Sequence, residues 1–127
     1  MEPKDIHILL IDDEDGFRRP MEFWLKAKGY HVAGAASGEE GLRMLARDRP
    51  SIICLDMKMP GMNGIEVLRK IRETDKNLPV IMITAHGTHE DMKEAEKLGT
   101  EGFFRKDDDF ATAARMILVA LASSRQN

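Results

Sequence analysis

Five short segments rich in apolar residues recur along the chain, separated by longer and more polar stretches. They cover residues 6–11, 30–35, 51–55, 78–83 and 102–105. Short, nearly continuous apolar segments of this kind are typical of strands that are buried on both faces of a parallel sheet. The pattern therefore predicts five strands.

The stretches between these segments predict five helices. In the first, Phe17, Met21 and Leu25 recur at helical spacing, and Gly29 is a typical helix stop. Pro20 lies inside this pattern and requires the helix to begin near residue 15 or 16, so that the proline falls in the first turn. Strands that alternate with helices are joined by right-handed crossovers into a parallel sheet covered on both faces. The prediction is one α/β domain with its core at about residues 4–122 and a frayed tail at 123–127.

The last predicted helix, residues 110–122, has two faces of different character. Four of its apolar residues share one stripe that is expected to face the sheet: Phe110, Ala114, Ile117 and Leu121. Met116 and Val119 fall off this stripe and are predicted to be exposed. Exposed apolar residues on a surface helix are compatible with ordinary surface composition and also with partner contact.

Composition narrows the class of protein. Of 127 residues, 43% are apolar and 32% are charged, which excludes general disorder. The formal net charge of −3 favours neither nucleic acid nor anionic lipid as a direct partner. A single cysteine excludes an internal disulfide framework. The start of the chain lacks the features of a secretion signal, and no apolar run is long enough to span a membrane, so a cytoplasmic protein is expected.

Polar residues follow four of the five predicted strands. Asp12 and Asp13 follow the first strand, Asp56 the third, Thr84 the fourth and Lys106 the fifth. Ligands of open α/β sheets bind outside the carboxyl ends of the strands, so these side chains are expected to converge. Three carboxylates packed together would repel each other, and a hard divalent cation would relieve that repulsion. The expected cofactor is Mg²⁺, with Mn²⁺ as an alternative.

Each of these residues also has a purely structural interpretation. Asp12 and Asp13 could serve a helix N-terminus, Asp56 could be a turn residue, and Lys106 could be a solvated charge. Their joint occurrence at the ends of four strands favours a functional site.

Four motifs extend this argument. They are Ile-Leu-Leu-Ile-Asp-Asp-Glu at 8–14, Leu-Asp-Met-Lys-Met-Pro-Gly-Met-Asn-Gly at 55–64, Ile-Thr-Ala at 83–85 and Phe-Phe-Arg-Lys at 103–106. Through these motifs, in this order, the sequence resembles the receiver domain of two-component response regulators over essentially its whole length. The resemblance implies a flavodoxin-like, doubly wound five-stranded parallel sheet with strand order 2-1-3-4-5 and five helices.

The resemblance also implies a phosphoacceptor chemistry. Asp56 would accept a phosphoryl group from a phosphohistidine of a sensor histidine kinase or histidine phosphotransfer protein. Asp13, Asp56 and the backbone carbonyl of Lys58 would hold Mg²⁺, with Asp12 assisting through water. The domain would then be a signalling module, active only in self-phosphotransfer and slow autodephosphorylation, rather than an enzyme.

Further roles follow from the same resemblance. Thr84 and Lys106 would contact phosphoryl oxygens, and Phe103 would fill the space that Thr84 vacates as it moves inward. This switch would act on a downstream protein partner, or on a second copy of the chain, through the fourth helix, fifth strand and fifth helix. Phe104 alternates to the opposite face and is expected in the core.

Two positions are candidates for tuning the lifetime of the phosphoryl group: Lys58 and His86. An exposed loop position is the alternative interpretation for both. The sequence departs from the family pattern after Lys106, where Asp107 replaces the usual proline. Because a cis bond to a non-proline residue is costly, the Lys106–Asp107 bond is predicted to be trans.

Two other functions share parts of this pattern. A phosphohydrolase with an Asp56 phosphoenzyme would also use an aspartate at a strand end, but such enzymes usually carry a second acid two residues later, where this chain has Lys58. A flavodoxin-like FMN carrier would need a hydroxyl-rich phosphate loop after the first strand, where this chain has four acidic residues at 12–15. The sequence leaves open whether the domain acts alone or within a longer regulator.

Overall fold

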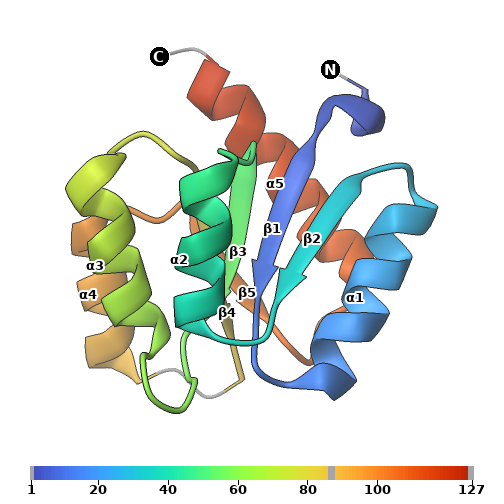
Figure 1. Ribbon diagram of the computed structural model, residues 1–127. Coiled ribbons are helices and arrows are strands. Elements are labelled where there is room, and N and C mark those ends of the chain that lie inside the picture. Colours follow the sequence, from blue (N-terminus) through green and yellow to red (C-terminus); the bar gives the residue numbers. More distant parts are fainter. Residues whose placement is uncertain (1, 86–87, 126–127) are drawn as a thin grey trace.

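A computed structural model describes the backbone of residues 2–85 and 88–125 and the side chains of 2–85 and 88–123. A short 3-10 turn, η1 (Pro3–Asp5), precedes the regular alternation of strands and helices (Figure 1). The elements are β1 (His7–Ile11), α1 (Asp15–Ala27), β2 (His31–Ala35), α2 (Gly38–Arg47), β3 (Ile52–Asp56), α3 (Gly64–Thr74), β4 (Val80–Thr84), α4 (His89–Leu98), β5 (Gly102–Arg105) and α5 (Phe110–Arg125). The five predicted strands and five predicted helices are confirmed.

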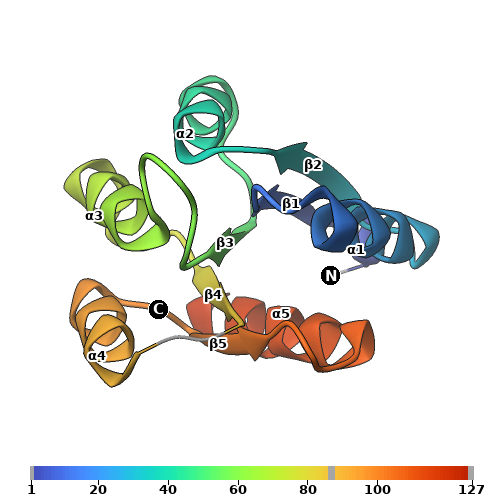
Figure 2. The same cartoon turned by 90° about the horizontal axis from the view of Figure 1, so that it is seen from below.

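The strands form one parallel sheet in the order β2-β1-β3-β4-β5, as predicted. Seen along the strands, α1 and α5 cover one face of the sheet, while α2, α3 and α4 cover the other (Figure 2). Each face buries its own apolar cluster. In β1, Ile8 and Leu10 pack toward α1 and α5, whereas Leu9 and Ile11 pack toward α2 and α3. The central strands are therefore apolar on both faces, which is the pattern that the sequence displays.

Helices α2 and α4 each begin directly after a residue whose side chain caps the helix. The Ser37 hydroxyl accepts a hydrogen bond from the Glu40 N–H at 3.1 Å, and the Thr88 hydroxyl accepts one from the Asp91 N–H at 3.1 Å. Such caps satisfy N–H groups that have no partner within the helix. Both caps place a helix directly behind the carboxyl end of a strand.

Three sequence expectations need correction. The helix α1 begins at Asp15 as predicted, yet Pro20 falls in its second turn rather than its first, where its missing N–H leaves the Gly16 carbonyl without its helical partner. The helix α5 continues to Arg125, beyond the predicted end at residue 122. Met116 is half-buried rather than exposed, because it packs toward Gly102 of β5, which has no side chain to fill that space.

Of the four residues of α5 predicted to face the sheet, two are buried and two, Phe110 and Ala114, are half-buried. Ile117 and Leu121 are buried against the sheet, and Val119 is 70% exposed. Ala113 and Ala120 complete the buried stripe, since small residues let the helix approach the sheet closely.

The loop from β3 to α3 is packed against the backbone that carries Asp56. A Cβ atom at Gly64 would overlap the Asp56 carbonyl and lie 2.8 Å from Met57 Cα. Backbone atoms of a buried strand end cannot move aside cheaply. We therefore expect Gly64→Ala to lower the free energy of unfolding by about 2 kcal/mol, as overpacking does.

Chemical denaturation checks this prediction, with Gly16→Ala as the matched control. A Cβ at Gly16, in the first turn of α1, would meet no atom within 4 Å. The control is expected to match or slightly exceed wild-type stability, because alanine favours the helix. Equal stability of Gly64→Ala and wild type would contradict the tight packing of this loop.

Candidate functional site

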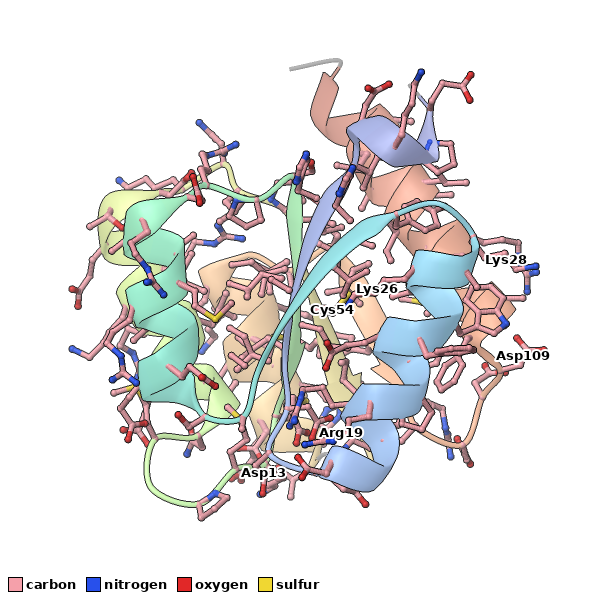
Figure 3. The ribbon with its side chains drawn as sticks, turned by 45° about the vertical axis from the view of Figure 1, so that its right-hand side comes forward. Asp13, Arg19, Lys26, Lys28, Cys54 and Asp109 are labelled. Carbon is pink, nitrogen blue, oxygen red and sulfur yellow. The ribbon has the colours of Figure 1, made fainter. Side chains whose placement is uncertain are left out.

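The polar residues predicted to converge do meet at one edge of the sheet. Asp12 directly follows β1, Asp56 and Thr84 are the last residues of β3 and β4, and Lys106 directly follows β5. Asp13 lies in the loop between β1 and α1, at the end of the molecule that is lowest in Figure 3. Because all strands run parallel, their carboxyl ends share this edge.

Three carboxylates form the centre of the site. Asp12, Asp13 and Asp56 can each present an oxygen so that all three oxygens lie within 4.8 Å of one another. Within the described residues, no other group of three or more His, Cys, Asp or Glu side chains comes together in this way. Asp12 and Asp56 are buried, while Asp13 is exposed, so the cluster opens to solvent on one side.

The donor set suits a hard divalent cation. All three side chains offer carboxylate oxygens, the ligands that Mg²⁺ and Mn²⁺ prefer. Asp12 Oδ2 is buried and accepts no hydrogen bond, although the Lys106 ammonium lies 3.0 Å away as a charge partner. A buried carboxylate oxygen with spare accepting capacity is a suitable ligand atom.

Lys106 supplies positive charge to the cluster. Its Nζ lies 3.0 Å from Asp12 Oδ2, 3.4 Å from Asp56 Oδ2 and 2.7 Å from Glu14 Oε1. Burial opposes the charged form, but hydrogen bonds to Glu14 and Asp12 outweigh it and raise the pKa of Lys106 above its usual value. Sequence reasoning missed Glu14 as a partner, although its place directly after the two aspartates was a usable signal.

The carboxyl group of Asp56 is hard to ionise in the absence of a cation. Burial and the neighbouring charge of Asp12 raise its pKa to about 7, against the opposing effect of Lys106. The backbone N–H of Lys58 donates to Asp56 Oδ1 at 3.3 Å, which also favours the ionised form. The site therefore holds more acid groups than its own basic group neutralises.

Of the two candidate tuning residues, only Lys58 lies in the described part of the chain. The Lys58 side chain is exposed and its Nζ lies 3.2 Å from Asp91 Oδ2 of α4, so it is paired with a helix rather than directed to Asp56. His86 lies outside the described residues. A tuning role for either residue stays a prediction.

The two candidate switch residues lie on β4 and β5. Thr84 is buried, and its Oγ1 has no hydrogen-bond partner. Phe103 is half-buried against the cluster on the α2, α3 and α4 face, whereas Phe104 is buried on the opposite face, as predicted. The switch role of Thr84 and Phe103 stays a prediction.

The loop after Lys106 begins with Asp107 rather than a proline. No cis peptide bond occurs in the parts of the chain that the structure describes, so the Lys106–Asp107 bond is trans as predicted. Asp107 pairs with Arg105 at 3.3 Å, and Asp109 accepts a hydrogen bond from the Thr112 N–H at 2.9 Å at the start of α5. Asp108 accepts a hydrogen bond from the Asp109 N–H at 3.0 Å, so each aspartate at 107–109 has a local partner other than Lys106.

A cleft of about 490 Å³ leads to Lys106 from solvent. Its lining residues are Glu14, Gly16, Phe17, Ala85, Lys106 and Asp107. It lies between the β1–α1 and β5–α5 loops, beside the acidic cluster, and gives a small molecule access to the carboxyl edge of the sheet.

Comparison with known proteins assigns the chain to a family. Residues 8–117 match the response regulator receiver domain. The chain belongs to this family, whose members are signalling modules of two-component systems with a flavodoxin-like fold. The predicted family and fold class are confirmed.

Individual relatives agree with this assignment. The chain is 42% identical to the transcriptional regulatory protein AfsQ1 of Streptomyces coelicolor, over 78% of this chain and 44% of the relative. It is 37% identical to sporulation initiation phosphotransferase F of Bacillus subtilis, over 80% of this chain and 82% of the relative. The chain thus spans less than half of one relative and most of the other.

One solved structure of similar fold is a chain in the CheX–CheY–BeF3–Mg²⁺ complex from Borrelia burgdorferi. The two folds superpose with a TM-score of 0.83 at 30% identity, over 90% of this chain and 87% of that chain.

None of the helices described here is long and apolar enough to cross a membrane.

Proposed function

We propose that Asp56 accepts a phosphoryl group from a phosphohistidine donor in a reaction that depends on Mg²⁺ or Mn²⁺. The donor would be a sensor histidine kinase or a histidine phosphotransfer protein in the cytoplasm, and residues 1–127 would act as one receiver module, alone or within a longer regulator. The observation that carries this proposal is the buried Asp56 carboxyl beside Asp12 and Lys106, at the open edge of the sheet.

The chemistry needs one nucleophilic oxygen and stabilisation of negative charge. An Asp56 carboxylate oxygen forms a bond to phosphorus as the bond from phosphorus to the donor imidazole nitrogen breaks, and the released imidazole takes up a proton. Phosphoryl transfer of this kind depends mainly on positioning and charge neutralisation. Lys106 lies close enough to contribute a positive charge to the transferred oxygens, and Thr84 offers a hydroxyl without a partner.

A bound divalent cation would neutralise charge on the phosphoryl oxygens and on the crowded carboxylates. Asp13, Asp56 and the backbone carbonyl of Lys58 are proposed as its ligands, with Asp12 assisting through water. The cluster of three carboxylates supports this assignment. The receiver-fold complex solved with BeF3 and Mg²⁺ gives further support by analogy.

The proposal is tested by intact mass spectrometry after incubation with Mg²⁺ and acetyl phosphate. Wild type is expected to gain one phosphoryl group, and Asp56→Asn or metal-free wild type to gain none. Release of phosphate from many phosphomonoesters, without a lasting adduct, would instead favour the phosphohydrolase alternative. The position of Lys58, exposed and paired with Asp91, provides no second acid for that alternative.

The signal would leave the domain through α4, β5 and α5. Thr84 would turn toward the new phosphoryl oxygens, and Phe103 would move into the space that it leaves. On the outer side of α5, Val119 is 70% exposed and Leu118 is 46% exposed. Val119 also borders a groove of about 430 Å³. Exposed apolar residues beside a groove suit contact with a protein partner or a second copy of the chain.

Phosphorylation is therefore expected to change self-association through this face. Light scattering is measured on wild type and Val119→Glu, each with and without BeF3 and Mg²⁺ as the phosphoryl mimic. Only wild type with the mimic is expected to change in mass, because a buried glutamate would oppose association. Identical masses in all four samples would exclude self-association and leave a different protein as the partner.

A further inference from the structure

Arg18 is a buried cation that links the backbone of the acidic site to two carboxylates of α1. It lies in α1 and is 7% exposed. Its Nη1 donates to the backbone carbonyl of Asp12 at 2.7 Å, its Nε donates to Glu22 Oε2 at 3.2 Å, and its Nη2 lies 2.7 Å from Asp15 Oδ1. All three guanidinium nitrogens are therefore engaged, which is the arrangement that a planar arginine fork allows and a lysine does not.

The contact with Asp12 fixes a peptide group at the centre of the site. The Asp12 N–H donates to the Ala35 carbonyl at the end of β2 at 3.0 Å, and the Asp12 carbonyl accepts from Arg18. The Asp12 carboxylate in turn accepts from the Glu14 N–H at 2.9 Å. The Asp12 carbonyl belongs to the peptide that leads into Asp13, so Arg18 holds the backbone that joins these two residues.

Glu22 holds Arg18 in this position, and a glycine makes room for it. The Glu22 carboxylate lies over Gly34 of β2, where an added Cβ would overlap one carboxylate oxygen and approach the carboxyl carbon to 2.6 Å. A side chain at residue 34 would push the carboxylate away from Arg18. The chain of contacts thus runs from Gly34 through Glu22 and Arg18 to Asp12.

We propose that Arg18 is a positioning residue that presets the Asp12 and Asp13 carboxylates for a divalent cation, and that Glu22, seated over Gly34, holds its guanidinium in place. This inference rests on the proposed cation site. Groups that orient metal ligands from behind commonly contribute about tenfold or more to metal affinity.

Positioning and simple electrostatics predict opposite results. Removing a positive charge beside the carboxylates would, by Coulomb attraction alone, strengthen cation binding. Loss of positioning would weaken it. Arg18→Lys and Gly34→Ala change no charge at all, so weaker binding by these variants would come from geometry.

The test is titration with Mn²⁺, with free ion measured by electron paramagnetic resonance and specificity checked by competition with Mg²⁺. Wild type, Arg18→Lys, Glu22→Gln and Gly34→Ala are compared well below their unfolding temperatures. We expect dissociation constants about tenfold higher for Arg18→Lys, with smaller increases for Glu22→Gln and Gly34→Ala. The matched control is Arg19→Gln, whose side chain is 74% exposed and approaches Asp15 only to 3.9 Å; its affinity should stay at or above that of wild type.

A double variant separates this mechanism from a general loss of stability. If Gly34→Ala acts by displacing the Glu22 carboxylate, then adding it to Glu22→Gln should cost little further affinity. Affinities of Arg18→Lys and Gly34→Ala equal to that of wild type would overturn the positioning role while leaving the cation site intact. No binding of Mn²⁺ by wild type would overturn the proposed function and this inference together.

Discussion

Without a divalent cation, Asp56→Asn is expected to be more stable than wild type at pH 8, by about 2–4 kcal/mol. The pKa of Asp56 is raised to about 7 by burial and by the charge of Asp12. One pKa unit corresponds to about 1.4 kcal/mol, so ionising this group in the folded state at pH 8 is costly. The asparagine side chain is similar in shape and removes that cost.

The raised pKa of Asp56 also makes the stability of the wild-type protein depend on pH. Between about pH 4 and pH 7 the folded state retains a proton on Asp56 that the unfolded chain releases, so wild-type stability falls as pH rises through this range. The advantage of Asp56→Asn should therefore be large at pH 8 and vanish near pH 4. Thermal or urea unfolding in EDTA at both pH values measures it.

Asp75→Asn is a control that is expected to change stability at pH 8 in the opposite direction from Asp56→Asn. The hydrogen bond from Arg49 lowers the pKa of Asp75, so this carboxylate contributes stability above its unfolded pKa, and that stability is lost as pH falls. The control should be less stable than wild type at pH 8. If Asp56→Asn also unfolded more readily than wild type at pH 8, the site would not be a cluster of repelling acids.

Lys106→Met is expected to have the opposite effect from Asp56→Asn, lowering metal-free stability at pH 8 by roughly 3 kcal/mol. The Lys106 side chain is 14% exposed and is the cation that contacts both Asp12 and Asp56. Removing one partner of a mostly buried ion pair leaves the other charge uncompensated. Phosphorylation by acetyl phosphate should fall as well, because the transferred oxygens lose a positive neighbour.

Two comparisons test whether Lys106→Met loses stability because Lys106 no longer neutralises the acidic cluster. Lowering the pH to 5 should narrow the gap between Lys106→Met and wild type, since the Asp56 carboxyl is then protonated. Arg105→Met, which removes the neighbouring positive charge, is the matched control and should change stability little, because Arg105 pairs with Asp107 at the exposed surface. Equal effects of the two variants would contradict a specific role for Lys106 in the cluster.

The sequence allowed the fold and the membership of the site to be predicted for a clear physical reason. Continuous apolar segments identify strands that are buried on both faces, and the residues directly after them mark one edge of a parallel sheet. Asp12, Asp56, Thr84 and Lys106 could be placed together by this rule alone. The strand order came from the family resemblance, since the alternation of strands and helices does not by itself fix it.

Contacts that depend on side-chain direction could not be predicted in the same way. Glu14 reaches Lys106 across the sheet edge, and Lys58 turns away from Asp56 to Asp91 of α4. Arg18 was indistinguishable in sequence from its exposed neighbour Arg19, although one is buried under the site and the other is solvated. Met116 was expected at the surface because helical periodicity does not register that Gly102 leaves space beneath it.

We expect Asp56, rather than a neighbouring acid, to carry the phosphoryl group. Intact mass alone does not distinguish Asp56 from Asp12 or Asp13, whose oxygens lie within 4.8 Å. Borohydride reduces an aspartyl phosphate to homoserine, so reduction after treatment with Mg²⁺ and acetyl phosphate, followed by peptide sequencing, locates the acceptor. The predicted result is homoserine at position 56 alone, and only when Mg²⁺ was present. Homoserine at position 12 or 13 would contradict it. So would a protein that had gained a phosphoryl group but showed homoserine at none of the three positions.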